Sequence, residues 1–438
     1  MTAGVGESAA RPRWAPDWFA FGALGVHLAM AWQLRVVAWP EVTTPGYLIA
    51  RGLLLYRDIK FVHTPGLMEL LAAAFSTLGV NADTLRFFAI LWPLAAHAAL
   101  LRETRTYGPG ARFWTSAFFL SMFYAWRGNS VWPSVAMAAL AIPIANALGR
   151  GRLRCAGLWI GAAILLKQTA ALLLAAVLLR FAIARRPFPA IPRLVIWASL
   201  PYAAAGLAFA AAGGGRDFVR WTLVIPFQLS SEILLAPTPF FVGMVVAAFL
   251  PTLFEALLEK PGDYEVPVRW HLLVAVGLVF VAYPRFHPME CVACLPCLAV
   301  GASRLLRRRA RPLHALAVAL VVALTIPTAF PLAAGERFDG KVVFWDDDPS
   351  IEVLVARLRS LPPDTTLLLD LWPNVLPRAG LLPPGRLYVH PWLPYLFEFD
   401  RVAERITRAA RRPGTAVVGF RGENTRGERA GPYVIQVR

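Results

Sequence analysis

Charged residues are scarce in this sequence: they make up 16% of its 438 residues, against roughly 25% in an ordinary soluble protein. Cysteine is also rare, and the four in the chain do not form the pattern of a disulfide framework. The glycine-rich nucleotide loops, the H-E-x-x-H zinc motif and the G-x-S-x-G nucleophile turn are all missing. These absences argue against an ATP-driven pump and against a soluble-type hydrolase.

Apolar segments of helical length dominate the sequence instead. Hydrophobic residues make up 57% of the chain, and their long runs recur from residue 17 to residue 334. Because about 20 apolar residues cross about 30 Å of hydrocarbon, we predict an all-α polytopic membrane protein with about eleven transmembrane helices. The predicted spans lie at about 17–39, 84–101, 113–126, 131–148, two within 155–184, 193–212, 240–257, 271–283, 291–303 and 313–333.

The apolar region 155–184 contains a lysine, Lys167, near its middle. Basic residues flank this region at both ends, and two basic flanks on the same side of a membrane imply an even number of crossings. We therefore interpret the region as a tight pair of spans with Lys167 and Gln168 at the far turn. The alternative is one long tilted span with a buried lysine.

The net charge of +17 could suggest a nucleic-acid partner. The arginines, however, cluster at the ends of apolar segments, where the positive-inside rule expects them. Counted over alternate breaks, they place the N-terminus in the cytoplasm. They also place the stretch 40–82, the first outer loop, and the tail after residue 334 on the outer side. We predict no nucleic-acid partner.

Residues 335–438 change character, because charge density rises and apolar runs shorten. We predict a membrane domain over 1–334 and a small extracytoplasmic α/β domain over 335–438. The expected helices of this domain are 351–361, which Ser350 would cap, and 401–411. Its expected strands are 365–371, 415–420 and 433–437.

Ionisable residues at membrane depth are costly and usually functional. Here most of them sort to the predicted outer side: Glu41, Asp58, Lys60, His63, Arg127, Lys167, Arg285, His287 and Glu290. Carboxylates, histidines and cations gathered at one face suggest a site that binds an anionic group and performs acid/base chemistry.

Three members of this group have a specific candidate role beside a plainer one. Glu41 follows the first span, where a carboxylate could have a raised pKa and act as a general base, or be a solvated loop acid like Asp58. Lys167 suits a phosphate as a point charge, or simply extends to the interface. Arg285 offers a fork for phosphate, or anchors the interface beside aromatic residues.

The cysteines at 291, 294 and 297 follow a spacing of three residues and so fall on one helical face. No fourth ligand is apparent, and the segment around them is apolar. We expect packing residues there and no metal site.

Several motifs follow one another along the predicted outer side. Glu41 comes after the first span, then Tyr47, then a leucine-rich stretch that leads to Tyr56-Arg57-Asp58 and to His63-Thr-Pro-Gly. Further on stand Leu-Lys-Gln-Thr at 166–169 and Tyr-Pro-Arg-Phe-His at 283–287. This order resembles the GT-C glycosyltransferases that use polyprenyl-phosphate sugars, in the bacterial branch of lipid A arabinose transferase and related lipopolysaccharide sugar transferases.

The resemblance implies an inverting glycosyltransferase in the cytoplasmic (inner) membrane of a bacterium, acting at the outer face for the cell envelope. A sugar would move from a polyprenyl-phosphate donor to a glycan, lipid or protein acceptor, without a cofactor. Glu41 or Asp58 would be the catalytic base. Donor phosphate binding would fall to Lys167, Arg285, Lys60 and His63, and further substrate contacts to Tyr47, Tyr56, Arg57 and His287.

The sequence departs from the family in two places. A single Glu41 stands where many relatives have an Asp-Glu pair before the tyrosine, and Arg127-Gly-Asn129-Ser130 occupies the place of a second acidic residue. The departures give no support to a divalent metal and leave Asp58 as a rival base. They also keep open a non-catalytic alternative, a transporter, flippase or scaffold for lipid-linked glycans.

Overall fold

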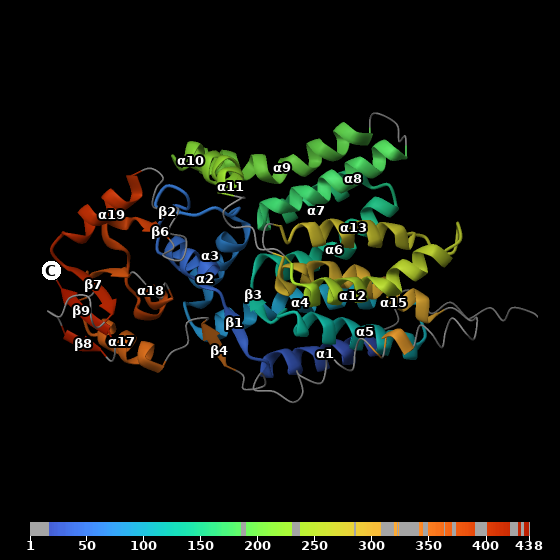
Figure 1. The fold of residues 1–438 in the computed structure, drawn as a ribbon, viewed down its shortest axis with the longest axis horizontal. Coiled ribbons are helices and arrows are strands. Elements are labelled where there is room, and N and C mark those ends of the chain that lie inside the picture. The colour runs from blue at the N-terminus through green and yellow to red at the C-terminus, as the bar shows by residue number, and fades with distance from the viewer. Residues whose placement is uncertain are drawn as a thin grey trace, which may run out of the picture.

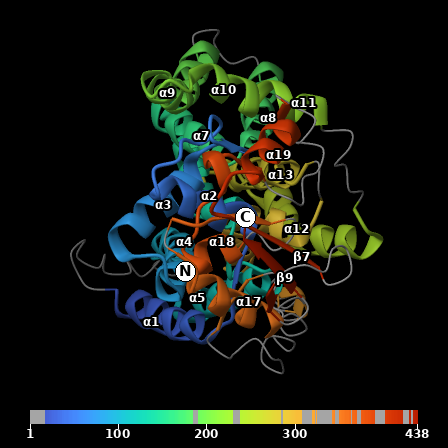
Figure 2. The ribbon, with the colours of Figure 1, turned by 90° about the vertical axis from the view of Figure 1, so that its left-hand side faces the viewer.

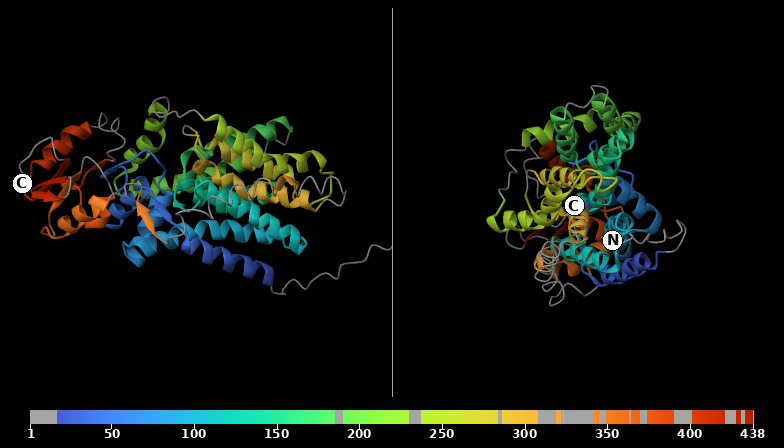
Figure 3. Two further views of the ribbon diagram at one scale, coloured as in Figure 1. Left: turned by 60° about the horizontal axis from the view of Figure 1, so that its bottom comes forward. Right: turned by 90° about the vertical axis from the view of Figure 1, so that its right-hand side faces the viewer.

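The computed structural model describes residues 17–184, 190–229, 237–283, 286–307, 319–321, 323, 341–344, 349–362, 364–369, 374–389, 401–420, 428–430 and 433–437. A bundle of helices with similar axial directions forms most of the molecule, and a smaller group of helices and strands lies at one end of it (Figures 1 and 3). The bundle helices are α1 (Trp18–Gln33), α4 (Ala82–Glu103), α5 (Pro109–Ala125), α6 (Pro133–Gly149), α7 (Leu153–Leu166), α8 (Ala171–Ile183), α9 (Ala190–Ala211), α12 (Pro239–Leu258), α13 (Val268–Phe280) and α15 (Leu295–Leu306).

Four helices of the described residues are long and apolar enough to cross a membrane by length and composition: Ala82–Glu103, Ala190–Ala211, Phe241–Leu258 and Pro288–Leu306. Large apolar side chains are exposed on several helices, among them Phe21, Leu179, Ile183, Ile196, Leu207 and Leu257. Hydrocarbon lipid tails would cover such side chains. The molecule is therefore a membrane protein.

The predicted break inside residues 155–184 is confirmed. Helix α7 ends at Leu166, Lys167 has extended backbone angles (φ −154°, ψ 121°), and a short 3-10 turn, η1 (Gln168–Ala170), leads into α8. The alternative of one long span is wrong. The eleventh predicted span, 313–333, lies outside the described residues except for 319–321 and 323, so the number of spans stays a prediction.

We call one end of the bundle the loop end, defined by α2 (Pro40–Ala50), β2 (Ile59–Lys60) and α3 (Gly66–Leu78). Residues 40–50, predicted to lie within the first outer loop, form the helix α2, and the position of this stretch on the outer side stays a prediction. Its Pro40 sits at the first helical position, where a missing N–H costs nothing. The helix then buries most of its residues, largely against α3.

Short strands close the loop end. Strand β1 (Val36–Ala38) lies between β3 (Ser130–Val131) and β4 (Val342–Phe344), parallel to both. Strand β2 pairs in parallel with β6 (Tyr388–Val389). The first predicted span, 17–39, is therefore a helix followed by a strand.

The C-terminal elements pack against the loop end (Figures 1 and 2). Four of their strands form a mixed sheet in the order β5 (Thr366–Leu369), β7 (Thr415–Phe420), β9 (Tyr433–Val437) and β8 (Glu428–Ala430). The strands and helices predicted for this part of the chain agree with the observed ones to within two residues at each end. These elements are α17 (Pro349–Arg359), β5 (Thr366–Leu369), α18 (Val375–Ala379), α19 (Val402–Ala410), β7 (Thr415–Phe420), β8 (Glu428–Ala430) and β9 (Tyr433–Val437). The predicted domain boundary at residues 334 and 335 lies outside the described residues and stays a prediction.

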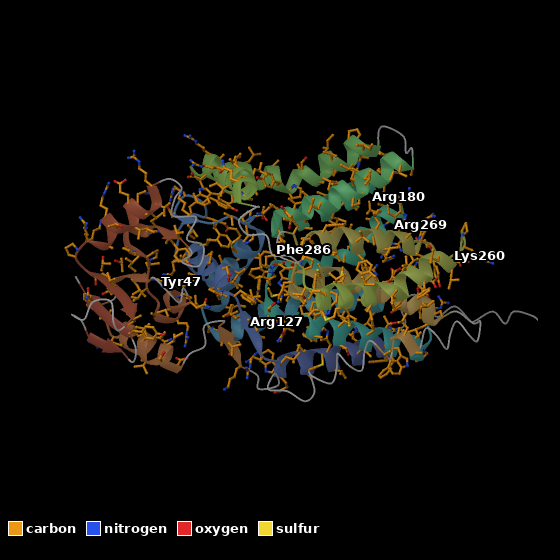
Figure 4. All side chains as sticks on the ribbon, viewed as in Figure 1. Tyr47, Arg127, Arg180, Lys260, Arg269 and Phe286 are labelled. Atoms are coloured by element: carbon orange, nitrogen blue, oxygen red, sulfur yellow. The ribbon has the colours of Figure 1, made fainter. Side chains whose placement is uncertain are left out.

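Short elements complete the described chain: α10 (Gly215–Val219), the π-helical η2 (Arg220–Val224), α11 (Ile225–Leu229), α14 (Pro288–Cys291), η3 (Val292–Cys294) and η4 (Pro384–Arg386). We call the end of the bundle opposite the loop end the arginine end, defined by Arg102, Arg150 and Arg304. Figure 4 shows other basic residues of this end, Arg180, Lys260 and Arg269, far from Tyr47 at the loop end.

Candidate active site

A buried ion pair joins Lys167 to Glu290 at the loop end. The Lys167 Nζ lies 2.7 Å from Glu290 Oε2, and their side chains are 6% and 8% exposed. Ser134 Oγ donates to the same Oε2 over 2.7 Å. Buried charges need such partners, because desolvation costs several kcal/mol per ion. Three separate helical segments therefore meet at one carboxylate.

The turn after Lys167 is hydrogen-bonded to the segment 62–64 of the loop end. Gln168 accepts from the Thr64 N–H over 3.2 Å and donates to the Val62 carbonyl over 2.5 Å. Thr169 donates to the Val281 carbonyl over 2.8 Å. The Leu-Lys-Gln-Thr motif thus holds the loop that carries His63 beside Lys167.

Glycine at position 66 allows the loop to approach α7 closely. A Cβ atom at Gly66 would lie 2.5 Å from the Leu165 carbonyl oxygen, well inside van der Waals contact. The His-Thr-Pro-Gly motif therefore ends in glycine because the backbone of α7 occupies the space of a side chain.

An aromatic wall connects Glu41 and His63 to this region. The Trp39 and Trp132 rings lie 5.5 Å apart, and His63 meets Trp132 edge-on at 6.5 Å. Glu41 stands half-buried in the first turn of α2, two residues after Trp39. Trp132 in turn caps α6, whose first turn carries Ser134. Trp39 and His63 thus lie beside Trp132 at the start of α6, and Glu41 follows Trp39 in the first turn of α2.

Asp58 is engaged in its own turn. Its carboxylate accepts the Leu54 N–H over 2.9 Å and two hydrogen bonds from Arg57 over 3.0 and 2.9 Å. Burial raises the pKa of Asp58, but these hydrogen bonds and the Arg57 charge outweigh it, so the pKa lies below its usual value. A carboxylate with these hydrogen bonds is a weak base, and it stabilises the turn that contains it. Arg57 serves the same turn.

Lys60 lies in a different neighbourhood from Lys167. Its ammonium donates to the Tyr56 carbonyl over 2.7 Å and lies 4.0 Å from Asp217. It also faces the Trp221 ring at 5.5 Å from the centroid. The structure thus groups Lys60 with α10 and η2 and does not show it beside Glu290.

The two candidate tyrosines are buried and bonded to backbone carbonyls. The Tyr47 hydroxyl donates to Leu381 over 3.1 Å, and the Tyr56 hydroxyl donates to His63 over 2.7 Å. Burial raises the pKa of both. Tyr47 joins α2 to the C-terminal elements, whereas Tyr56 supports the loop around His63; their predicted substrate contacts stay a prediction.

His287 begins α14, and its Nδ1 accepts from the Met289 N–H over 3.3 Å. Burial lowers its pKa, and the charge of nearby Arg127 adds to this effect. Arg127 itself adopts left-handed backbone angles (φ 63°) in the turn before β3. Arg285, the predicted second phosphate ligand, lies outside the described residues.

An apolar groove of about 600 Å³ lies between α3, α7 and α9, next to the segments that carry this cluster. Leu70, exposed at 46%, stands at its outer part, and Trp92 and Phe209 line its sides. Its inner wall includes Pro65, Gly66, Leu165 and Leu166. Pro65 directly follows Thr64 and Leu166 directly precedes Lys167, so the groove adjoins the segments that carry the ion pair.

No family model and no curated protein matches the sequence. Among solved structures, ArnT from Cupriavidus metallidurans, crystallised with bound undecaprenyl phosphate, matches with a TM-score of 0.64 at 12% identity. The match covers 95% of this chain and 97% of that one. This chain has the GT-C fold.

Recognition of the GT-C fold from the motifs between residues 40 and 66 is thus confirmed. Sequence reasoning placed Glu290 at the same face as Lys167 but gave it no role, and it missed Ser134 altogether. Glu290 is the one carboxylate between residues 265 and 336, and that isolation was the available signal. Within the described residues, no three His, Cys, Asp or Glu side chains gather so that they could hold a metal ion.

Proposed function

We propose that this protein is an inverting membrane glycosyltransferase that uses a polyprenyl-phosphate-linked sugar as donor and acts at the outer face of the cytoplasmic membrane. The observation that carries the proposal is an apolar groove that adjoins the segment of the Lys167–Glu290 pair within a GT-C fold. The groove suits a polyprenyl chain, and the ion pair meets the phosphate end. A non-catalytic transporter, flippase or scaffold is not favoured by the similarity to ArnT.

Lys167 would hold the donor phosphate. An ammonium has three N–H groups, and among the described residues that of Lys167 spends one, on Glu290. Two remain for phosphate oxygens. Glu290 and Ser134 fix the position of the ammonium in advance, so little reorganisation is needed when negative charge develops on the leaving phosphate. His63 lies on the same side of the cluster, and Arg285 and Lys60 stay proposed contributors.

Glu41 would be the general base. The acceptor hydroxyl oxygen attacks the anomeric carbon from the face opposite the phosphate, and its proton passes to the Glu41 carboxylate. The bond between the anomeric carbon and the phosphate oxygen breaks, and polyprenyl phosphate leaves. Asp58 is the poorer candidate, because hydrogen bonds from Arg57 and Leu54 already occupy its carboxylate.

The C-terminal elements would contribute to recognition of the acceptor. Asn374 accepts a hydrogen bond from Thr43 over 2.6 Å, and Thr43 belongs to the same helix as Glu41. Residues near α18 therefore border the side from which an acceptor would reach the base.

Release of polyprenyl phosphate by purified protein tests the proposal, with a panel of radiolabelled polyprenyl-phosphate sugars as donors. We expect release by the wild type, loss of at least 100-fold in Glu41→Gln, the lower bound of a typical acid–base contribution, and retained turnover in Asp58→Asn. Full activity of Glu41→Gln would remove Glu41 as the base. Tight binding of donors without turnover of any of them would replace the transferase by a carrier or scaffold.

A further inference from the structure

A second cavity, of about 870 Å³, lies at the arginine end. Arg152, which lines it, and Lys167 flank the two ends of α7. The 14 residues of that helix separate them by about 21 Å at 1.5 Å per residue. The cavity is therefore separate from the proposed transfer site.

The floor of this cavity is a closed network around Arg304, which is 2% exposed. The guanidinium donates to the Val266 carbonyl over 2.7 Å and lies 3.3 Å from Glu103 and 3.4 Å from Glu259. The Tyr264 ring covers it at 4.2 Å. These contacts make the floor rigid and balance its charge, so an incoming anion would not bind there.

The mouth of the cavity is different. Arg102 and Arg152 are exposed, and within the described part of the chain neither side chain has an ion-pair or hydrogen-bond partner. Arg150, beside them, pairs with the exposed Glu265 over 2.9 Å. In total the lining contains five arginines against three acids, so positive charge is in excess at the mouth.

Three helices end at this cavity and one helix begins there. The C-termini of α4, α6 and α15 meet the cavity and carry partial negative charge, which Arg102 and Arg304 in the last turns of α4 and α15 and the cap residue Arg150 of α6 offset. Helix α7 instead begins here: its cap residue, Arg152, forms no side-chain cap hydrogen bond. Its first-turn N–H groups therefore add positive potential beside Arg102 and Arg152.

An apolar wall adjoins the basic mouth. Ala99, Ile142 and Pro143 line the cavity, as does Trp159, which is 42% exposed. An exposed tryptophan beside arginines is typical of the membrane–water interface. A small inorganic anion would use the arginines alone, whereas an amphiphile would use both surfaces.

We propose that this cavity binds the phosphate-bearing head group of an anionic phospholipid, with its acyl chains against Trp159 on the outside of the bundle. Arg102 and Arg152 contact the phosphate, and the N-terminus of α7 supports it. Basic pockets between transmembrane helices bind such head groups elsewhere. The proposal does not depend on sugar transfer.

The chain carries its own reporter for a test. Cys155 lines the cavity and is exposed, whereas the other three cysteines, Cys291, Cys294 and Cys297, are buried. The rate at which neutral N-ethylmaleimide modifies Cys155 can be measured in nanodiscs of phosphatidylcholine, or of equal parts phosphatidylcholine and phosphatidylglycerol. Cys155→Ala confirms the site of modification.

We expect phosphatidylglycerol to slow modification in the wild type and in the control Arg193→Gln/Arg269→Gln, which removes two charges from the same end outside this cavity. Arg102→Gln/Arg152→Gln should lose this protection. At about 1 kcal/mol for each arginine, its affinity for the lipid falls about 30-fold. The lower surface pH of the anionic membrane slows modification in every variant alike, so the difference in protection between the double variant and the control isolates the contribution of Arg102 and Arg152.

Three results would overturn the proposal. Equal modification rates in both membranes would mean that no anionic lipid enters the cavity. Protection that survives Arg102→Gln/Arg152→Gln would place the lipid elsewhere. Equal protection by inorganic phosphate in phosphatidylcholine nanodiscs would make the cavity a site for a soluble anion.

Discussion

The buried pair of Lys167 and Glu290 gives the sharpest test of how the loop end is held together. Removing one partner of a buried ion pair costs about 3–5 kcal/mol, because the other charge stays without compensation. Both side chains are less than a tenth exposed, so solvent screening does not reduce this figure. We expect Glu290→Gln and Lys167→Met each to be destabilised by about that amount.

The double variant Lys167→Met/Glu290→Gln should recover most of the loss. It contains no buried charge, and the Gln carbonyl still accepts the hydrogen bond from Ser134. Replacing a whole buried pair by neutral groups is often close to neutral for stability. The exposed pair of Arg150 and Glu265, at 34% and 75%, provides the matched control: Glu265→Gln should cost less than about 1 kcal/mol.

Thermal unfolding, monitored by intrinsic fluorescence in a single detergent, ranks the variants by melting temperature. Both single variants should have melting temperatures well below that of the wild type, whereas the double variant and Glu265→Gln should have melting temperatures close to it. Single variants that melt with the wild type would show that the pair is not buried as described. A double variant as unstable as the sum of its parts would show that the two residues act independently.

Three further predictions follow from the same end of the molecule. Gly66→Ala should lower both the melting temperature and donor turnover, because its Cβ meets the Leu165 backbone, whereas Gly110→Ala, with nothing within 4 Å, should change neither. The lowered pKa of Asp58 stabilises the fold above the ordinary Asp pKa of about 3.9, and this stability is lost as pH falls through the folded value. The free energy of unfolding, measured against pH, should therefore fall less steeply at acid pH in Asp58→Asn than in the wild type. The same fall in both proteins would contradict the assignment. Asn374→Ala should expose the C-terminal elements to faster proteolysis at a cost of about 1–3 kcal/mol, and unchanged cleavage would show that this contact does not hold them.

Sequence reasoning succeeded where the signal was local. The break at Lys167 followed from basic residues on both flanks and a polar pair in the middle. The strands β7 and β9 followed from length and residue type. Each of these features depends on neighbours in the sequence.

Sequence reasoning failed where contacts between distant segments determine the local structure. Residues 40–50 contain two prolines and several polar residues, which favour a loop, but burial against α3 makes them helical. Residues 36–38 are apolar enough for a span, and their strand exists because distant segments pair with them. Glu290 meets Lys167 across 123 positions, and no local pattern encodes that partnership.

The position of β1 between β3 and β4 has a consequence for biosynthesis. Val36 of β1 pairs with Val342 of β4. Strand β4 therefore leaves the ribosome about 300 residues after β1, or roughly 15–60 s later at 5–20 residues per second. Most of the bundle is inserted before this sheet can close. The loop end would thus be the last part of the molecule to mature, and a nascent chain stopped before residue 342 would hold a bundle whose β1 lacks one of its two partner strands.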